Sequence, residues 1–63
     1  MTPIEKASKL ISYYLPFCND NLTDAKYCAT ISVDEIIDAL KNNASNSASW
    51  LYYEEVKQEI VNN

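Results

Sequence analysis

Glycine, histidine and arginine are absent from this chain of 63 residues. Without histidine, the chain lacks the usual general base at neutral pH. Without glycine, it lacks the residue that a phosphate-binding loop or a nucleophile elbow requires. The two cysteines are too few ligands for a structural zinc site. We therefore expect a protein that is not an enzyme and that holds no metal and no other cofactor.

Positive charge is also scarce. The five Lys residues are outnumbered by nine Asp and Glu residues, which gives a net charge of −4 at pH 7. Proteins that bind nucleic acid use clusters of Lys and Arg to neutralise phosphates, so nucleic acid is not an expected partner. A mimic of DNA would need a denser carboxylate array than these scattered acids provide.

Long hydrophobic runs are missing as well. No apolar stretch approaches the roughly 18 residues of a membrane helix, and no secretion or lipidation pattern is present. We expect no membrane partner and a cytoplasmic location. The hydrophobic content of 48% and the charged content of 22% are typical of a folded protein. Residues 1–63 are therefore expected to form a single helical domain with a small core.

The longest helical pattern covers residues 24–41 and organises the predicted fold. Small and apolar residues recur three or four positions apart, which places them on one stripe of a helix. This stripe contains Ala25, Ala29, Ser32, Val33, Ile36 and Leu40, with Cys28, Ile37 and Ala39 beside it. Thr23 is the expected N-cap, and the charges of Asp24 and Lys41 suit the two ends. Small residues in the first half predict close approach of neighbouring helices there.

A first helix is predicted over residues 3–14. Thr2 and Glu5 have the spacing of a capping box, with Pro3 at the first helical position. Its expected core stripe contains Ile4, Ala7, Ser8, Ile11, Tyr14 and Leu15, with Leu10 beside it. Pro16 is expected to end the helix, because the residue before a proline is disfavoured in the helical region.

The connection over residues 16–22 is short and rich in turn-forming residues, namely Asn19, Asp20 and Asn21. Short connections are typical of antiparallel neighbours in helical bundles. We expect Phe17 and Leu22 to fold back onto the core from this connection.

A third helix is predicted over residues 50–61, after a linker rich in Asn and Ser. Because the chain has no glycine, Asn42 or Asn43 is expected in the left-handed conformation that ends the preceding helix. Ser47 or Ser49 is the expected N-cap. The inward stripe contains Trp50, Tyr53, Val56 and Ile60. The three helices predict an all-α fold, a short three-helix bundle with the central helix packed between the first and third.

Cys18 and Cys28 stand ten residues apart, and a bridge between them would tie the first connection to the central helix. Disulfides are rare in reducing compartments, and no export pattern is present. We expect two free thiols, with Cys28 as a small core residue and Cys18 partly packed in its loop.

Two acidic side chains on the central helix, Asp34 and Asp38, lie one turn apart on the same face. This geometry is compatible with a divalent cation. Two carboxylates without a third ligand are more typical of a solvated helix face, which we expect here together with Thr30 and Lys41.

Aromatic residues are plentiful for a core of this size, with five Tyr, one Trp and one Phe. Tyr and Trp are enriched where proteins meet. Four large side chains fall off the predicted core stripes: Tyr13, Tyr27, Ile31 and Tyr52. Two interpretations stay open. They form an exposed apolar patch that binds a protein partner, or they cap the edges of the core with their hydroxyls in water.

The segments AKYCATISVDEIIDAL and YYEEVKQEI resemble a group of small uncharacterised proteins from phages and mobile elements of Bacteroidetes bacteria. That group shares a Cys-Ala-x-Ile-x-Val-Asp-Glu-Ile core followed by Tyr-Trp-x-x-Val-Lys-x-Glu-Ile. The segment EKASKLISYYLPF is compatible with it, so the resemblance covers most of the chain. Tyr52 and Tyr53 stand where the pattern has Tyr-Trp. The resemblance implies a helical fold and a phage or mobile-element origin, hence the cytoplasm of a bacterial host cell, and it supplies no catalytic residue.

These observations lead to three functional hypotheses. The first is a non-enzymatic binding module that docks on a host or phage protein, for example as an inhibitor. The second is a structural or accessory phage component that self-associates. The third, a small enzyme or metal-dependent factor, would require a bound metal or a pocket.

Overall fold

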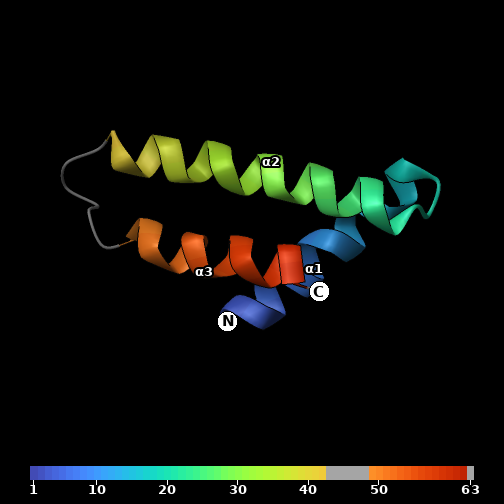
Figure 1. The fold of residues 1–63 in the computed structure, drawn as a ribbon, viewed down its shortest axis with the longest axis horizontal. Helices are drawn as coiled ribbons and strands as arrows, with labels where there is room; N and C mark the ends of the chain where they lie inside the picture. Colours follow the sequence, from blue (N-terminus) through green and yellow to red (C-terminus); the bar gives the residue numbers. More distant parts are fainter. Residues whose placement is uncertain (43–48, 63) are drawn as a thin grey trace.

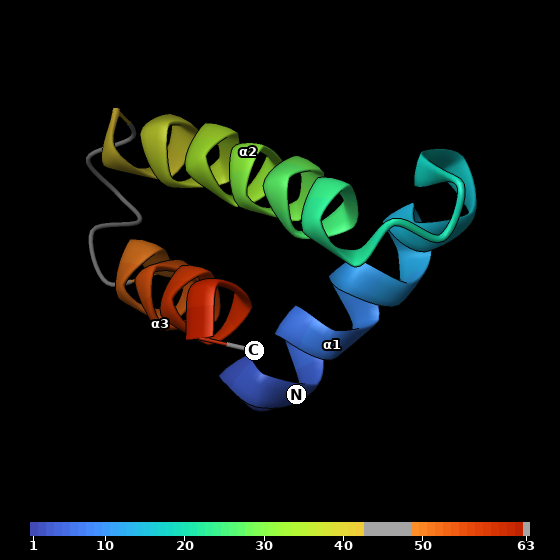
Figure 2. The same ribbon diagram turned by 45° about the vertical axis from the view of Figure 1, so that its right-hand side comes forward.

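Three helices, α1 (Pro3–Tyr14), α2 (Leu22–Lys41) and α3 (Ser49–Asn62), dominate this computed structural model, which describes residues 1–42 and 49–62. A short 3₁₀ helix, η1 (Leu15–Cys18), follows α1. Helices α2 and α3 lie side by side and run in opposite directions, and α1 crosses obliquely below them (Figure 1, Figure 2). Each of the three helices contacts the other two. The predicted all-α three-helix bundle is therefore confirmed.

Helix α1 begins as the sequence predicts. The Thr2 hydroxyl accepts a hydrogen bond from the Glu5 backbone N–H at 3.2 Å, and the Thr2 N–H donates to Glu5 Oε1 at 2.9 Å. This capping box satisfies two backbone donors at the helix start, while Pro3 occupies a position that needs no donor. Both predicted bounds of the helix, residues 3–14, are confirmed.

The chain does not leave the helical region at the residue before Pro16, as the sequence suggested. Leu15 keeps right-handed helical angles (φ −50°, ψ −49°), and its N–H donates to the carbonyl oxygen of Ile11. The direction changes later, at Asn19 and Asp20, whose φ values are 54° and 58°. Asn and Asp tolerate this left-handed region better than other non-glycine residues. The reversal therefore falls on the predicted turn formers but after an extra helical turn.

Two residues of this connection do not reach the core. Phe17 was expected to pack inward, and so was Leu22, but both side chains are exposed. The extra turn of η1 carries Phe17 outward, and Leu22 becomes the first residue of α2 at the end of the bundle. Neither position has a neighbouring helix to cover it.

Helix α2 begins two residues earlier than predicted. Asn21, not Thr23, is its N-cap, and Asn21 Oδ1 accepts a hydrogen bond from the Asp24 N–H at 3.1 Å. Asp24 in the first turn and Lys41 in the last have the charges that oppose the helix dipole, as expected. The expected left-handed end is not found at Asn42, which stays right-handed (φ −80°, ψ −5°). The alternative at position 43 lies outside the described residues.

Helix α3 exceeds its predicted range of 50–61 by one residue at each end. Ser49 is the first helical residue, and the other expected cap, at position 47, lies outside the described residues. Val56 and Ile60 are buried as predicted, whereas Trp50 and Tyr53 are half-buried at the edge of the core. The four residues of the predicted stripe therefore all face the core, although only two of them are fully buried.

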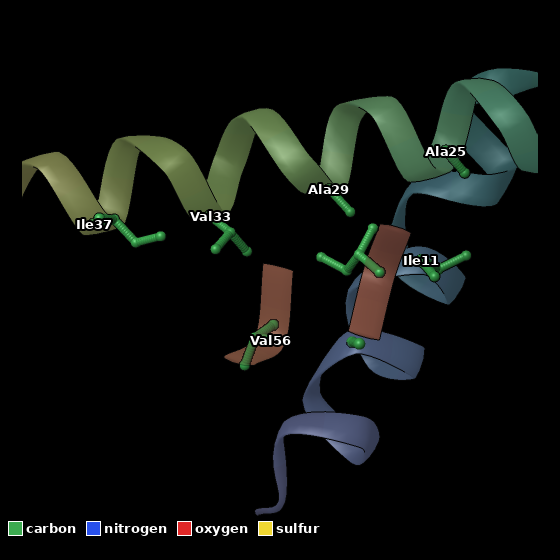
Figure 3. Packing of buried hydrophobic residues seen from close by; sticks show 8 residues of the cluster. Ile11, Ala25, Ala29, Val33, Ile37 and Val56 are labelled. Carbon is green, nitrogen blue, oxygen red and sulfur yellow. The ribbon is translucent and has the colours of Figure 1, made fainter. Parts of the chain in front are cut away.

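The core is small and is built mainly on α2 (Figure 3). Its buried members are Ala7 and Ile11 from α1, Ala25, Ala29, Val33 and Ile37 from α2, and Val56 and Ile60 from α3. Alanines fill the first half of the α2 stripe and branched residues fill the second, as the sequence predicts. The small side chains of α1 and α2 allow the backbones of these crossing helices to approach closely.

Several predicted core positions lie outside this core. Ile4 and Ser8 are exposed, which corrects the expected stripe of α1. Ser32, Ile36 and Leu40 on α2 are half-buried, and so is Cys28. Helix α1 crosses the other helices obliquely, and its buried contacts are made by Ala7 and Ile11. The Tyr14 and Ser32 hydroxyls hydrogen-bond each other, which joins the end of α1 to α2.

Candidate functional site

The candidate site lies on the face of α2 that points away from the core. Tyr27 is 68% exposed and Ile31 is 43% exposed. They are four residues apart, so they lie on neighbouring turns of one face. The fully buried Ala29 and Val33 each follow one of these residues by two positions. At 100° per residue, the buried and the exposed side chains point in directions about 200° apart around the helix. The structure therefore brings two of the four predicted site residues together, on a surface that the bundle leaves uncovered.

Three carboxylates continue the line of Tyr27 and Ile31 along α2. Asp24, Glu35 and Asp38 are exposed, and with the apolar pair they follow the spacing 3, 4, 4, 3. This spacing keeps all five on one face over roughly 21 Å of helix. We call this set (Asp24, Tyr27, Ile31, Glu35 and Asp38) the outer stripe. It presents an apolar pair with negative charge on both sides along the helix.

Two lysines, Lys57 of α3 and Lys41 of α2, make contacts outside the outer stripe. Lys57 Nζ of α3 lies 2.7 Å from Asp34 Oδ1, at the edge between the inner and outer faces of α2. The hydrogen bond and charge of Asp34 raise the pKa of Lys57 above its usual value. Lys41 Nζ lies 4.6 Å from the centroid of the Trp50 ring. These contacts direct both cations toward α3 and leave the outer stripe acidic.

The expected solvated face of α2 is only partly correct. Asp38 and Lys41 are exposed, but Asp34 is half-buried in its ion pair with Lys57. Thr30 is half-buried too, and its hydroxyl donates to the Lys26 carbonyl oxygen at 2.8 Å. Asp34 therefore acts as a link between α2 and α3.

Tyr13 occupies a different surface. It is 62% exposed near the end of α1, where its ring lies 5.8 Å from the ring of Phe17 and 5.2 Å from that of Tyr14. Phe17 is 76% exposed. The sequence predicts Phe17 in the core, so its part in this second aromatic surface is not foreseen. Its position directly after Pro16, next to the turn, was the feature that pointed to exposure.

Tyr52 has a structural contact. It is half-buried at the beginning of α3, and its hydroxyl donates to the Met1 carbonyl oxygen at 2.9 Å. Its ring stands edge-to-face on Tyr53, with centroids 5.1 Å apart. Tyr52 thus ties the beginning of the chain to α3, and it lies on a different helix from the outer stripe. The prediction that all four residues share one exposed patch is not supported by this placement.

Three features of other functional classes do not occur in residues 1–42 and 49–62. No group of three His, Cys, Asp or Glu side chains is arranged to hold a metal ion. No polar or charged residue is buried. None of the helices in these ranges combines the length and the apolar character needed to cross a membrane.

An open hollow lies at the start of α1, beside α3. It is lined by Thr2, Pro3, Ile4, Glu55, Gln58 and Glu59. Thr2 and Glu5 are already engaged in the capping box at this end, and the hydrogen bonds from Thr2 hold the pKa of Glu5 below its usual value. None of the four predicted site residues lines this hollow.

Comparisons complete the description of the site. Searches with this chain against protein-family models, curated proteins and solved structures give no match. The resemblance to phage and mobile-element proteins of Bacteroidetes therefore stays a prediction from the sequence.

Proposed function

We propose that this chain is a non-enzymatic protein-binding module that docks on a basic surface of another protein through the outer stripe of α2. The observation that carries the proposal is the exposed pair of Tyr27 and Ile31 on the face opposite the core. Large apolar side chains on neighbouring turns cost solubility and add little to the fold where they face water, so a binding role accounts for them. Tyrosine is also among the residues that dominate binding energy at protein interfaces.

Charge selects the kind of partner. The apolar pair has Asp24 on one side and Glu35 with Asp38 on the other, and the whole chain has a net charge of −4. A partner with Lys or Arg beside an apolar contact is complementary to this pattern, and such complementarity speeds association and fixes orientation. A second copy of the chain would bring carboxylates against carboxylates in either direction of α2. The stripe therefore favours a different, basic protein over self-association.

The sequence resemblance suggests where the partner protein comes from. A phage or mobile-element origin makes a protein of the bacterial host or of the phage the natural partner. Inhibition of that partner by covering its basic surface is the concrete form of the proposal. The second candidate function, a phage component that self-associates, has the exposed Tyr13 and Phe17 surface in its favour, because that surface has no cluster of like charges in its immediate sequence.

The test is site-specific photo-crosslinking in a lysate of Bacteroidetes cells. The photoreactive analogue p-benzoylphenylalanine replaces Tyr27 in one sample and Tyr13 in a matched control. We expect a covalent adduct with a basic protein from position 27, and no such adduct from position 13. The adduct should disappear when Glu35→Lys and Asp38→Lys are added, because both substitutions reverse charges beside the apolar pair.

Two outcomes would contradict the proposal. If position 27 gives only an adduct of twice the mass of the chain, the partner is a second copy and the self-association alternative holds. If both positions give the same set of adducts, or if the charge reversal leaves the adduct unchanged, the outer stripe does not select the partner. Light scattering after size exclusion then separates a monomer from a self-associated species.

A further inference from the structure

Two thiols from different elements meet at the turn between α1 and α2. Cys18 ends η1 and Cys28 lies in the second turn of α2, and their Sγ atoms are 3.8 Å apart. Both side chains are half-buried, and both are free thiols in this structure. The left-handed residues Asn19 and Asp20 reverse the chain between them, which places the end of η1 against α2.

A covalent bond between the two sulfurs requires a closer approach than this structure shows. A disulfide needs its sulfurs at about 2 Å, so the two Sγ atoms have to approach each other by about 2 Å. Besides its position at the end of η1, Cys18 is held by one backbone bond across the turn, from the Asn21 N–H to the Cys18 carbonyl oxygen at 2.9 Å.

We propose that Cys18 and Cys28 form a reversible disulfide that ties η1 to α2, with a low-molecular-weight disulfide such as oxidised glutathione as the oxidant. One protein thiolate attacks a sulfur of oxidised glutathione and releases one glutathione thiolate. The second protein thiolate then attacks the mixed disulfide and releases the other. Two protein thiols are oxidised to one disulfide, one oxidised glutathione is reduced to two thiols, and the two protons end on glutathione. This proposal does not rest on the proposed function.

The reduced pair reacts slowly at neutral pH. Burial, and next the hydrogen bond with Cys28, raise the pKa of the Cys18 thiol, with smaller effects from the charges of Cys28 and Asp24. Because the thiolate is the reactive form, a raised pKa slows uncatalysed oxidation of Cys18 at neutral pH. The free thiols expected from the sequence describe this reduced state. Oxidation would fix Phe17, the residue before Cys18, and with it the exposed Tyr13 and Phe17 surface.

The test uses the full chain in buffers with graded ratios of reduced to oxidised glutathione, alkylation of the remaining thiols and intact mass spectrometry. We expect a monomer that lacks both alkyl groups and is about 2 Da lighter than the reduced chain, without bound glutathione. The native chain should have an oxidation equilibrium constant about 10-fold or more above that of the same chain unfolded in guanidinium, because only the fold holds the sulfurs together. The oxidised chain should also melt roughly 10 °C or more above the reduced chain, since the bridge restricts the unfolded state.

The variants Cys18→Ser and Cys28→Ser are matched controls. Each keeps one thiol and should accumulate a mixed disulfide with glutathione in the buffers that give the internal bond in the parent chain. Glutathione adducts on both cysteines of the parent, or dimers joined by disulfides, would overturn the proposal. So would equal oxidation equilibrium constants for the native and unfolded chain, or an oxidised form that melts below the reduced form, because either result means that the fold does not hold the sulfurs in place.

Discussion

The two faces of α2 carry isoleucine in opposite surroundings. On the inner face Ile37 is 4% exposed and packs with the core, whereas on the outer face Ile31 is 43% exposed and follows the exposed Tyr27. Both faces obey the same three-and-four spacing, because that spacing is a property of the helix and not of its neighbours. The comparison teaches that a long helix in a small bundle can carry an apolar pair on its outer face, in addition to the apolar stripe that the fold buries. The outer stripe that contains this pair is then the place to look for a partner.

The same substitution on the two faces gives the largest expected contrast. Ile37→Ala removes buried methylene groups and should lower the free energy of unfolding by about 2 to 5 kcal/mol, enough to unfold much of a chain this small. Ile31→Ala should change it by less than about 1 kcal/mol. The gain in helix propensity is the same for both, so it cancels in the comparison. Urea denaturation followed by circular dichroism measures both values, and equal losses would break the distinction between the faces.

A second contrast tests the close approach of neighbouring helices to the first half of α2, where the buried side chains are alanines. Ala29→Leu adds three carbons where no surface is exposed and should destabilise the fold by about 1 to 3 kcal/mol. Ala39→Leu on the same helix is the matched control, because Ala39 is exposed and Leu has nearly the helix propensity of Ala. Thermal unfolding of both variants provides the measurement. A stable Ala29→Leu variant would mean that the helices can separate there at little cost.

The sequence predicted the fold well because helix periodicity and end signals are local. The capping box of Thr2 and Glu5 and the inward stripe of α3 both depend on residues within a few positions of one another. Some errors concern local end signals, since Asn21 and not Thr23 caps α2 and Leu15 stays helical before Pro16. Other errors occur where distant parts of the chain decide the outcome. Ile4 shares the inward spacing of α1, yet it is exposed because α1 crosses the other helices obliquely, and Ile4 lines an open hollow beside α3 instead of joining the core. Such a crossing angle depends on the packing of whole helices, and no local pattern specifies it.

The candidate site was predictable in part for the same reason. Tyr27 and Ile31 lie off the core stripe by spacing alone, and the structure places them on an uncovered face. Tyr52 also lies off its stripe, but a contact with Met1, 51 positions away, takes it into the bundle. The exposure of Phe17 results from the extra helical turn of η1, which the sequence did not predict. The three carboxylates of the outer stripe were visible as a spacing that runs through Tyr27 and Ile31, once the two apolar residues are taken as its centre.

The smallest expected effect on stability concerns the ion pair of Asp34 and Lys57, at the edge between the two faces of α2. Because Asp34 raises the pKa of Lys57, the pair stabilises the folded state below the usual lysine pKa of 10.5, and this contribution is lost as the pH rises through the raised value. Asp34→Asn should therefore destabilise the chain slightly at neutral pH, and its difference from the parent should shrink in strongly alkaline buffer. Glu35→Gln, on the outer face, should show no such change. Thermal unfolding across this pH range compares the two variants, and a constant difference for Asp34→Asn would contradict the role of the pair.

The most direct test of the account removes the apolar pair of the outer stripe altogether. Thermal unfolding of the double variant Tyr27→Ser and Ile31→Ser is suitable, because Ser has nearly the helix propensity of Tyr and Ile. We predict a midpoint within about 4 °C of the parent, since the fold does not use this face. A fall of about 10 °C or more, comparable to that expected for Ile37→Ala, would show that the fold needs these side chains and would contradict their assignment to a partner.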